Sequence, residues 1–179
     1  MNLRGSRQPA LPDALKTEGC SLHSLAVQHW ALDQALSRDP DVVAWTYYPV
    51  DMTEQQARQR IQNFLEEPRR GRVRRYVILT GEDDPVGTCA IGALDEGSPR
   101  VSYAVLPEAR KRGFATRAAR LLAECALTSG YGTVSLETIE GNLASERVAS
   151  KAEFVAVERY QGVHRGQKVW MTRWTRTRP

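Results

Sequence analysis

One stretch decides the fold of this chain: residues 100–122, RVSYAVLPEARKRGFATRAARLL. Its first part is rich in β-branched and aromatic residues, which favours a strand, and Pro107 has no N–H to continue a ladder. From Ala115 onward the apolar residues recur at the spacing of a half-buried helix, at Ala118, Leu121, Leu122, Cys125 and Ala126. The stretch therefore predicts a strand, a short basic loop and a helix.

The loop at residues 110–113 carries three consecutive cations followed by Gly113. Glycine lets backbone amides come close to a ligand, and the first amides of a helix have no partner within the helix. Together with the helix dipole and the arginines, this arrangement indicates an anion cradle that suits a phosphate. A solvated basic loop is the alternative interpretation at this point.

Further strands and helices are expected on both sides of this unit. Strands are expected at residues 20–25, 75–80, 86–94, 133–138, 154–160 and 168–175, and helices at 26–37, from Thr53 to the residues before Pro68, and at 143–151. Thr53 and Gln56 have the spacing of a capping box, and Asn142 is suited to cap the last helix. This order predicts an α/β or α+β sheet domain.

The basic loop also matches a family motif. Residues 110–115, RKRGFA, fit the Gln/Arg-x-x-Gly-x-Gly/Ala pyrophosphate loop of the GCN5-related N-acetyltransferases (GNAT superfamily), and RGFAT at 112–116 resembles the ribosomal-protein N-terminal acetyltransferase (RimJ/RimL-like) branch. Residues 142–154 are similar to the family's Asn-x-x-Ala/Ser…Lys-x-Gly-Phe segment, although Glu153 replaces the usual Gly and His23 stands where Arg is common. The resemblance implies a mixed, mostly antiparallel sheet of about seven strands flanked by about four helices.

The resemblance implies acetyl-CoA as co-substrate. The loop amides would hold its pyrophosphate, and the backbone of Val105 and Leu106 would pair with the pantetheine arm, with the Val105 N–H also reaching the thioester oxygen. The other expected cofactor-binding residues are Arg110, Lys111, Arg112, Gly113, Phe114, Ala115, Thr116, Asn142 and Lys151.

Two residues are candidates for proton transfer. Glu137 has the opposite strand parity to Leu136 and resembles the glutamate that ribosomal-protein N-acetyltransferases use as a base. A carboxylate that simply faces water is the alternative. The tyrosine that serves as acid in many relatives is replaced by Ala149, so Ser145 is the candidate substitute, unless it binds the cofactor or only starts the helix.

The expected acceptor is a primary amine: a protein N-terminus, an amino acid or a small-molecule amine. Trp45, Tyr47 and Tyr48 lie in an aromatic segment that predicts a substrate wall, with a lid over the core as the alternative.

The net charge is +4, and arginines gather at residues 69–75 and in a C-terminal region that has no acid after Glu158. Such patches allow contact with RNA or the ribosome, or they only maintain solubility. The alternative functions are therefore a catalytically weak module that binds nucleic acid or regulates a partner, and an acetyltransferase that acts on aminoacyl-tRNA.

The bulk properties set the remaining expectations. A chain of 179 residues predicts one domain at 14–179 after a loose arm at 1–13, as monomer or homodimer. It has no apolar run of membrane-spanning length and no signal-peptide pattern, so a cytoplasmic location without membrane contact is expected. Cys20, Cys89 and Cys125 are too scattered for a disulfide framework, and no His or Cys spacing predicts a metal site.

Overall fold

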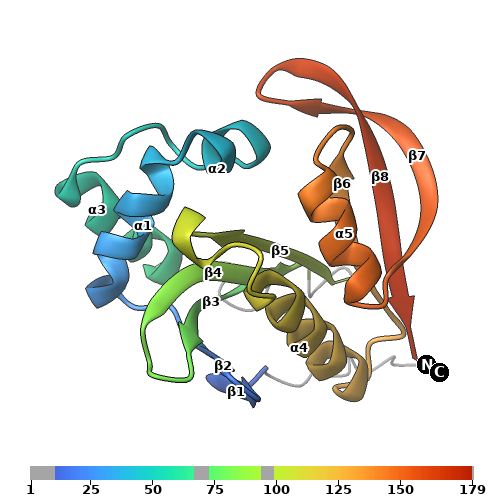
Figure 1. Ribbon diagram of the computed structural model, residues 1–179, viewed down its shortest axis with the longest axis horizontal. Coiled ribbons are helices and arrows are strands. Elements are labelled where there is room, and N and C mark those ends of the chain that lie inside the picture. The colour runs from blue at the N-terminus through green and yellow to red at the C-terminus, as the bar shows by residue number, and fades with distance from the viewer. Residues whose placement is uncertain (1–10, 67–72, 94–98, 179) are drawn as a thin grey trace, which may run out of the picture.

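The computed structural model describes residues 11–66, 73–93 and 99–178 (Figure 1). The elements are β1 (Ala14–Thr17), β2 (Cys20–Ser24), η1 (Val27–His29), α1 (Trp30–Arg38), α2 (Pro40–Trp45), α3 (Glu54–Glu66), β3 (Arg74–Thr80), β4 (Pro85–Gly92), β5 (Arg100–Val105), η3 (Pro107–Ala109), α4 (Phe114–Thr128), β6 (Thr133–Ile139), α5 (Leu143–Lys151), β7 (Val155–His164) and β8 (Gln167–Thr177). One mixed sheet has the strand order β1-β2-β3-β4-β5-β6-β8-β7. The predicted α/β class is confirmed, with eight strands and five α-helices among these residues.

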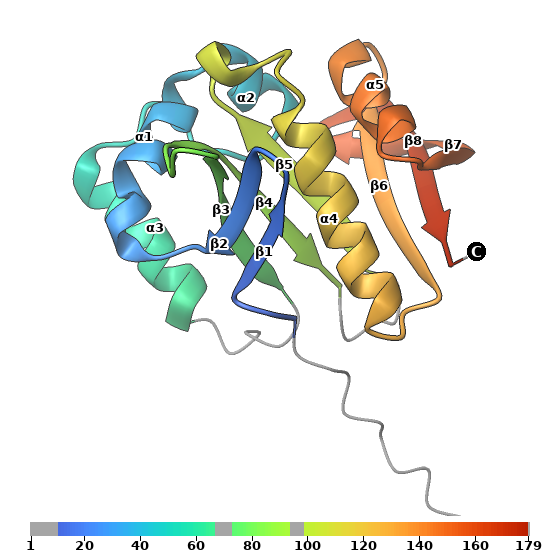
Figure 2. The same cartoon turned by 60° about the horizontal axis from the view of Figure 1, so that its bottom comes forward.

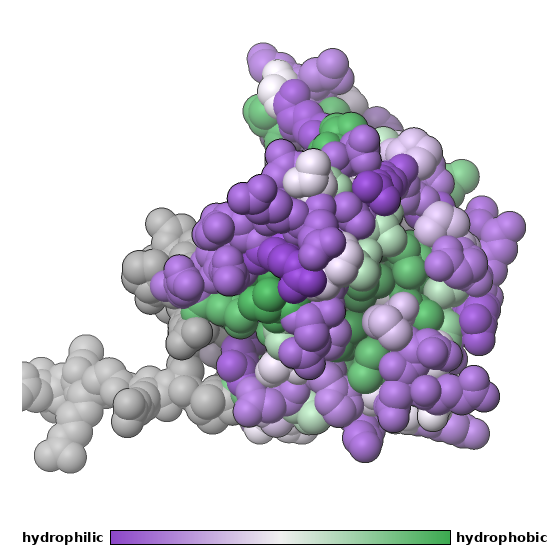
Figure 3. Space-filling view, turned by 90° about the vertical axis from the view of Figure 1, so that its left-hand side faces the viewer, coloured by the Kyte–Doolittle hydropathy of each residue, from purple (hydrophilic) through white to green (hydrophobic). Residues whose placement is uncertain are grey.

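Helices cover both faces of the sheet (Figures 1 and 2). Alternate strand residues point to opposite faces, so Tyr76 and Ile78 enter the core beneath α4 and α5, whereas Val77 enters the core beneath α1, α2 and α3. On the side shown in Figure 3, polar residues dominate the surface and hydrophobic residues gather in one area among them.

The beginning of the chain differs from the prediction. A short strand, β1, precedes the first expected one and pairs antiparallel with β2. Residues 11–13, which were expected to belong to a loose arm, are anchored: Leu11 is buried, and its carbonyl accepts a hydrogen bond from Arg74 Nη2 at 2.9 Å. A four-residue, largely exposed edge strand has no readable periodicity. The rest of the predicted arm, 1–10, lies outside the described residues.

The helical part contains one helix more than expected. The first helix ends at Arg38, close to the expected end at residue 37, but α2 begins at once with Pro40 in its first position. Proline is favoured there because the first helical N–H has no partner in any case. The Asp39 carboxylate accepts a hydrogen bond from the Val42 N–H at 2.8 Å and so caps α2. The expected aromatic loop at 42–50 is therefore helical up to Trp45.

The last two strands are longer than expected, because residues 161–164 extend β7 and only Arg165 and Gly166 form the turn. Both turn residues have positive φ, 48° and 79°, as tight hairpins require. The expected α4, α5 and β3–β4 hairpin are confirmed. The capping box is also present, since Thr53 N donates to Gln56 Oε1 and Gln56 N to Thr53 Oγ1.

The central feature of the sheet is the divergence of β5 and β6. These two strands are parallel and pair at only two positions, Arg100 with Ser135 and Val101 with Leu136. Beyond Val101, β5 remains paired with β4 on its other side, while β6 continues along β8 as far as Ile139. The backbone edges of β5 and β6 therefore separate toward the N-terminus of α4 (Figure 2).

Candidate functional site

The N-terminus of α4 forms a set of unpaired backbone donors. Gly113 precedes the helix with φ of 81°, in the left-handed region that favours glycine. The first hydrogen bond within the helix runs from Arg117 N to Gly113 O at 3.0 Å. The amides of Phe114, Ala115 and Thr116 lie ahead of this bond, where an anion can accept from them.

Cations surround these amides. Lys111 and Arg112 are exposed, and Lys111 also has a positive φ, of 62°. The guanidinium groups of Arg112 and Arg117 lie 5.2 and 5.0 Å from the centroid of the Phe114 ring. Arg117 also donates to the Arg112 carbonyl at 3.1 Å, which holds the loop against the first turn of α4.

Arg110 has a different position from the other loop cations. Its guanidinium pairs with Asp39 at 2.6 Å and with Asp41 at 2.9 Å, and so ties the loop to α2. Burial of Asp39 disfavours its charged form, but the hydrogen bonds from Arg110 and from the Val42 amide outweigh burial and lower the pKa of Asp39. Arg110 thus connects the anion cradle to the helix that carries Trp45.

Asp39→Asn is expected to lower the free energy of unfolding at pH 7 by about 1–2 kcal/mol. Asparagine retains the helix cap, so the variant removes only the charge on Asp39. Because the folded-state pKa is lowered, this contribution is present above the unfolded pKa of about 3.9 and is lost as the pH falls through the folded value. Urea unfolding of both proteins at pH 7 and pH 3 measures this; a difference in stability that does not shrink at pH 3 would contradict the ion pair.

The backbone of β5 has one amide that faces the divergence. Leu106 N donates to Val86 O on β4 at 2.9 Å, so the Leu106 amide is already used. Adjacent residues of a strand direct their amides to opposite edges, so the Val105 N–H points away from β4, toward β6. Gly87 permits this close strand pair, because a Cβ there would collide with the Ala104 carbonyl oxygen.

The N-terminus of α5 lies on the other side of the divergence. Asn142 Oδ1 accepts from Ser145 N at 3.0 Å, which confirms the predicted cap. Ser145 Oγ lies 2.8 Å from the hydroxyl of Tyr103 on β5. At the far end of α5, Lys151 is exposed and its carbonyl accepts from Arg120 of α4 at 2.6 Å.

Sequence reasoning missed Tyr103, although a signal was present. Tyr103 has the strand parity of Val101 and Val105, which places its side chain beside α4 and α5. Burial raises the pKa of Tyr103, the hydrogen bond with Ser145 opposes this rise, and the net result is a pKa of about 12. Ala149, where many relatives have tyrosine, is fully buried one turn after Ser145.

Glu137 lies on the opposite face of the sheet, in a polar network. Its carboxylate accepts a hydrogen bond from the Tyr160 hydroxyl at 2.7 Å and pairs with Arg100 at 3.2 Å and Arg173 at 3.5 Å. The Glu137 side chain is 12% exposed. The partial burial of Tyr160 and the hydrogen-bonded Glu137 carboxylate both raise the pKa of Tyr160. A carboxylate in this network is not a simple surface charge.

The tip of the β7–β8 hairpin meets α2 and the segment after it (Figure 1). The Tyr47 hydroxyl donates to Val163 O at 3.0 Å, and the Tyr47 ring centroid lies 4.9 Å from that of His164. His164 Nε2 lies 2.9 Å from Ala44 O, and Arg165 donates to Thr46 O at 3.1 Å. The hairpin tip is therefore fixed to the aromatic segment.

The three aromatic candidates have different surroundings. Tyr47 is 70% exposed, and Trp45 is partly exposed with its ring beside Gly141, 3.8 Å from where a Cβ of residue 141 would stand. Tyr48 is buried, and its hydroxyl is bonded to Asp33 at 2.9 Å and lies 2.7 Å from Thr88 Oγ1. Burial and the Asp33 carboxylate raise the pKa of Tyr48. Tyr48 supports this surface from beneath instead of lining it.

The C-terminal arginines are largely paired with acids from earlier elements. Arg173 pairs with Glu158 at 2.6 Å, and Arg176 with Glu153 at 2.7 Å. Arg178 donates to the Leu127 carbonyl at 2.9 Å. The predicted contact with RNA stays a prediction. The ion pairs formed across the strands neutralise part of the positive charge that favoured such a contact. Arg69, Arg70 and Arg72 of the other basic cluster lie outside the described residues.

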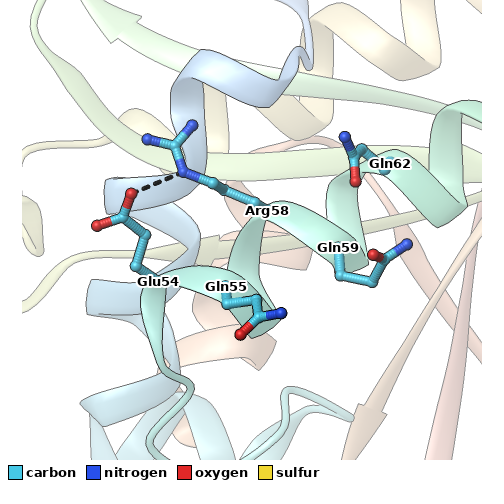
Figure 4. Close-up of a pocket in the computed structure, with 5 residues that line it drawn as sticks. All are labelled: Glu54, Gln55, Arg58, Gln59 and Gln62. Carbon is cyan, nitrogen blue, oxygen red and sulfur yellow. Dashed lines mark hydrogen bonds and ion pairs between the residues drawn. The ribbon is translucent and has the colours of Figure 1, made fainter.

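Other site types find little support in the described ranges. No group of three or more His, Cys, Asp or Glu side chains there is arranged to hold a metal ion, and no helix there could span a bilayer. A polar hollow of about 420 Å³ on α3 is lined by Glu54, Gln55, Arg58, Gln59 and Gln62 (Figure 4). All five come from one helix, and Glu54 and Arg58 pair with each other at 2.8 Å. This hollow lies apart from the divergence of β5 and β6.

A diverging parallel pair of strands beside a glycine-led helix N-terminus is the arrangement that the family resemblance implied. The family model described as an acetyltransferase (GNAT) domain matches residues 22–155, three quarters of the chain. The chain belongs to the GNAT acetyltransferase family. This family membership accounts for the loop at the start of α4 and the segment that begins at Asn142.

Solved structures share the fold of this acetyltransferase at low sequence identity. RimL, the ribosomal L7/L12 α-N-protein acetyltransferase with coenzyme A, has a TM-score of 0.79 at 15% identity over 93% of this chain and 97% of its own. The microcin C7 self-immunity acetyltransferase MccE, with acetyl-CoA and AMP, has a TM-score of 0.80 at 12% sequence identity, covering 90% of this chain and 93% of its own. The Vibrio cholerae spermidine N-acetyltransferase, with coenzyme A and spermine, has a TM-score of 0.76 at 12% sequence identity, covering 90% of this chain and 96% of its own. No curated protein matches the sequence.

Proposed function

We propose that this protein transfers the acetyl group of acetyl-CoA to a primary amine by direct attack of the amine on the thioester. The observation that carries the proposal is the divergence of β5 and β6 next to the unpaired amides that open α4. This is one continuous site, with strand edges for an extended amide chain and an anion cradle at its end.

The coenzyme would bind this chain at several points. The amides of Phe114, Ala115 and Thr116 would donate hydrogen bonds to its pyrophosphate, with Lys111 and Arg112 as nearby cations. The Val105 N–H is directed to bond the thioester oxygen, where negative charge develops as the amine attacks. Asn142 holds the first turn of α5, and Lys151, at its last residue, is exposed for a more distant phosphate.

The acceptor would approach from the face that carries Glu137. The Glu137 carboxylate serves as the base, because an ionised carboxylate can take a proton from an ammonium through water. Trp45 and Tyr47, held by the hairpin tip, form the wall that meets the acceptor. RimL acts on a ribosomal-protein α-amine and the Vibrio enzyme on spermidine, so a protein N-terminus and a polyamine are the first acceptors to test.

Binding of acetyl-CoA is the direct test of the proposed function. A ligand present at 100 times its Kd stabilises the folded protein by about 2.7 kcal/mol, which corresponds to a rise in Tm of roughly 5–10 °C for a chain of this size. Differential scanning fluorimetry with up to millimolar acetyl-CoA measures this rise. An unchanged Tm at millimolar acetyl-CoA would contradict the proposal.

Glu137→Gln is expected to lower kcat roughly 10²-fold, because the group that takes the proton of the amine is lost. Glutamine can still accept the Tyr160 hydrogen bond but cannot take a proton. Glu140→Gln is the matched control, because Glu140 pairs with Arg159 at 2.8 Å in an exposed position in the turn directly after β6. If kcat of Glu137→Gln matches that of the wild type, Glu137 has no part in the mechanism.

A further inference from the structure

The face of the sheet that carries Glu137 is open to solvent along the middle of β5. Ser102 is exposed, although β5 lies between β4 and β6 in the sheet. Its partner on β4 is Ala90, and the partner of Arg100 on β4 is Gly92. Directly paired residues share a face, so the β4 neighbours of Arg100 and Ser102 there are small. An acceptor can therefore lie along β5 between Arg100 and the divergence of β5 and β6.

Arginines and glutamates pair with each other on this face. Arg100 is the partner of Ser135 on β6, two residues before Glu137, so Arg100 and Glu137 point to the same side. Arg173 on β8 lies directly opposite Glu137 on one side and Glu158 on the other. Glu137 and Glu158 are the acids of strands β4 to β8, and both are paired with arginines. These strands therefore have no free carboxylate for a second ammonium group.

This distribution of charge distinguishes between classes of amine. A polyamine carries several ammonium groups, and those that do not react would meet arginines and carboxylates that are already paired. Like charges brought together in this way weaken binding. Arg165 at the hairpin tip adds another cation, which donates to the carbonyls of Thr46 and Tyr48 and so keeps its charge. The surface therefore disfavours a polycation and favours an acceptor with a negative charge.

Arg100 is the arginine best placed to bind that charge. Its side chain is 53% exposed, and its Nη1 lies 3.2 Å from Glu137 Oε2. A guanidinium has several N–H donors in a planar fork, so contact with one Glu137 oxygen leaves donors for a ligand. Arg173 is less exposed, and Glu158 already holds it at 2.6 Å. An anion bound to Arg100 lies next to the carboxylate that is the proposed base.

We propose that Arg100 binds a carboxylate of the acceptor and so selects amines that carry a carboxylate a few bonds from the reacting nitrogen. The inference rests on the proposed acetyl transfer and names the class of acceptor for that site. A carboxylate fits better than a phosphate monoester, because it brings a single negative charge, and not about two, close to Glu137. A free amino acid and a peptide N-terminus followed by an acidic residue share this chemistry.

Two matched pairs of acceptors test the proposal and separate these two sources. Alanine and alaninamide differ in the α-carboxylate, and the α-amides of the dipeptides Ser-Glu and Ser-Gln differ in a side-chain carboxylate. With saturating acetyl-CoA, we expect the wild type to have about tenfold higher kcat/KM for the carboxylate member of at least one pair. The pair that shows this preference identifies the source. Spermidine should be a poorer acceptor than that carboxylate member.

Substitutions at position 100 should change the ratio of kcat/KM between the members of the preferred pair. Arg100→Gln should lower this ratio about tenfold, Arg100→Glu should lower it further, and Arg100→Lys should retain most of it. Both members of a pair are measured on the same protein, so a general effect of the variant on Glu137 cancels in the ratio.

Arg159→Gln is the matched control for these variants. Arg159 is 54% exposed and pairs with Glu140 at 2.8 Å, so its exposure and its type of partner resemble those of Arg100. Its partner on β8 is Thr172, next to Arg173, which directs Arg159 to the opposite face of the sheet. The ratio in Arg159→Gln should equal that of the wild type.

Each outcome decides between the inference and the proposed function. A wild type that uses the neutral members or spermidine as well as the carboxylate members overturns the inference alone, and this result needs no variant. Equal ratios in the wild type and Arg100→Gln also overturn it. If no acceptor turns over, the Tm of the coenzyme A complex decides: an equal rise with both members of each pair overturns the inference. Failure of the wild type to bind acetyl-CoA overturns the proposed function as well.

Discussion

Gly113→Glu is expected to abolish the rise in Tm that acetyl-CoA gives the wild-type protein. Gly113 has φ of 81°, and a Cβ there would stand 3.3 Å from Nη1 of Arg117, whose Nη2 donates to the Arg112 carbonyl. The new side chain disturbs this contact, and its carboxylate brings a negative charge to the amides that would donate to the pyrophosphate. Scanning fluorimetry with and without acetyl-CoA measures the loss, and a full shift in the variant would remove the loop from the binding site.

The control for backbone strain comes from the other end of α4. Gly130 also has positive φ, 105°, and a Cβ there would have no neighbour within 4 Å. Gly113→Ala and Gly130→Ala should both lower stability by about 1–2 kcal/mol, because alanine is disfavoured in the left-handed region. Only the substitutions at position 113 should weaken acetyl-CoA binding. If Gly130→Ala weakens acetyl-CoA binding as much as the position-113 variants do, the loss of binding results from lower helix stability and not from the loop.

The elements of the fold that were predictable are those whose signals are local. The turn into α4 needs a positive φ that glycine supplies, and the helix after it has an unbroken apolar face, so residues 110–128 could be read from the sequence. Asn142 and the box at Thr53 and Gln56 were equally accessible, because a cap depends on residues three apart. Pro40 at the start of α2 is a local signal too, because proline suits the first helical position, but no helix was predicted there.

The partners of the site residues could not be predicted, because pairing across the sheet determines them. Arg110 was expected to face the phosphate, yet Asp39 and Asp41 of α2 hold it. The C-terminal arginines looked free because no acid follows Glu158, but Glu153 comes into contact with Arg176 through the fold. Register between distant strands has no local signature, and a one-residue slip would exchange the two faces.

The contact between Tyr103 and Ser145 illustrates the same limit. The position of Ala149 indicated that a tyrosine was missing, and Ser145, four residues earlier in the helix, was the candidate substitute. Tyr103 is 42 residues away, and only the packing of β5 against α5 places its hydroxyl at Ser145. A contact of this kind depends on tertiary packing, so a single sequence motif does not reveal it.

Asp33→Ala is expected to lower the free energy of unfolding by about 3–5 kcal/mol, a larger loss of stability than that expected for Asp39→Asn or Gly113→Ala. Asp33 is 1% exposed, and both of its oxygens accept from Arg60 Nη1, at 2.8 and 2.6 Å. Its removal leaves a half-buried guanidinium without its carboxylate and the Tyr48 hydroxyl without one of its two partners. Urea unfolding at pH 7 measures the loss.

The buried charge, and not the lost volume, should account for most of this loss. If so, the double variant Asp33→Leu/Arg60→Leu recovers much of the stability, because it removes both charges and adds apolar contacts beneath α1 and α3. Glu140→Gln breaks an exposed pair and should change stability by no more than about 1 kcal/mol. A double variant that is less stable than Asp33→Ala would show that the polar network itself holds Tyr48 in place. In that event the proposed aromatic wall at Trp45 and Tyr47, which precedes Tyr48 in the same segment, depends on the buried ion pair of Asp33 with Arg60.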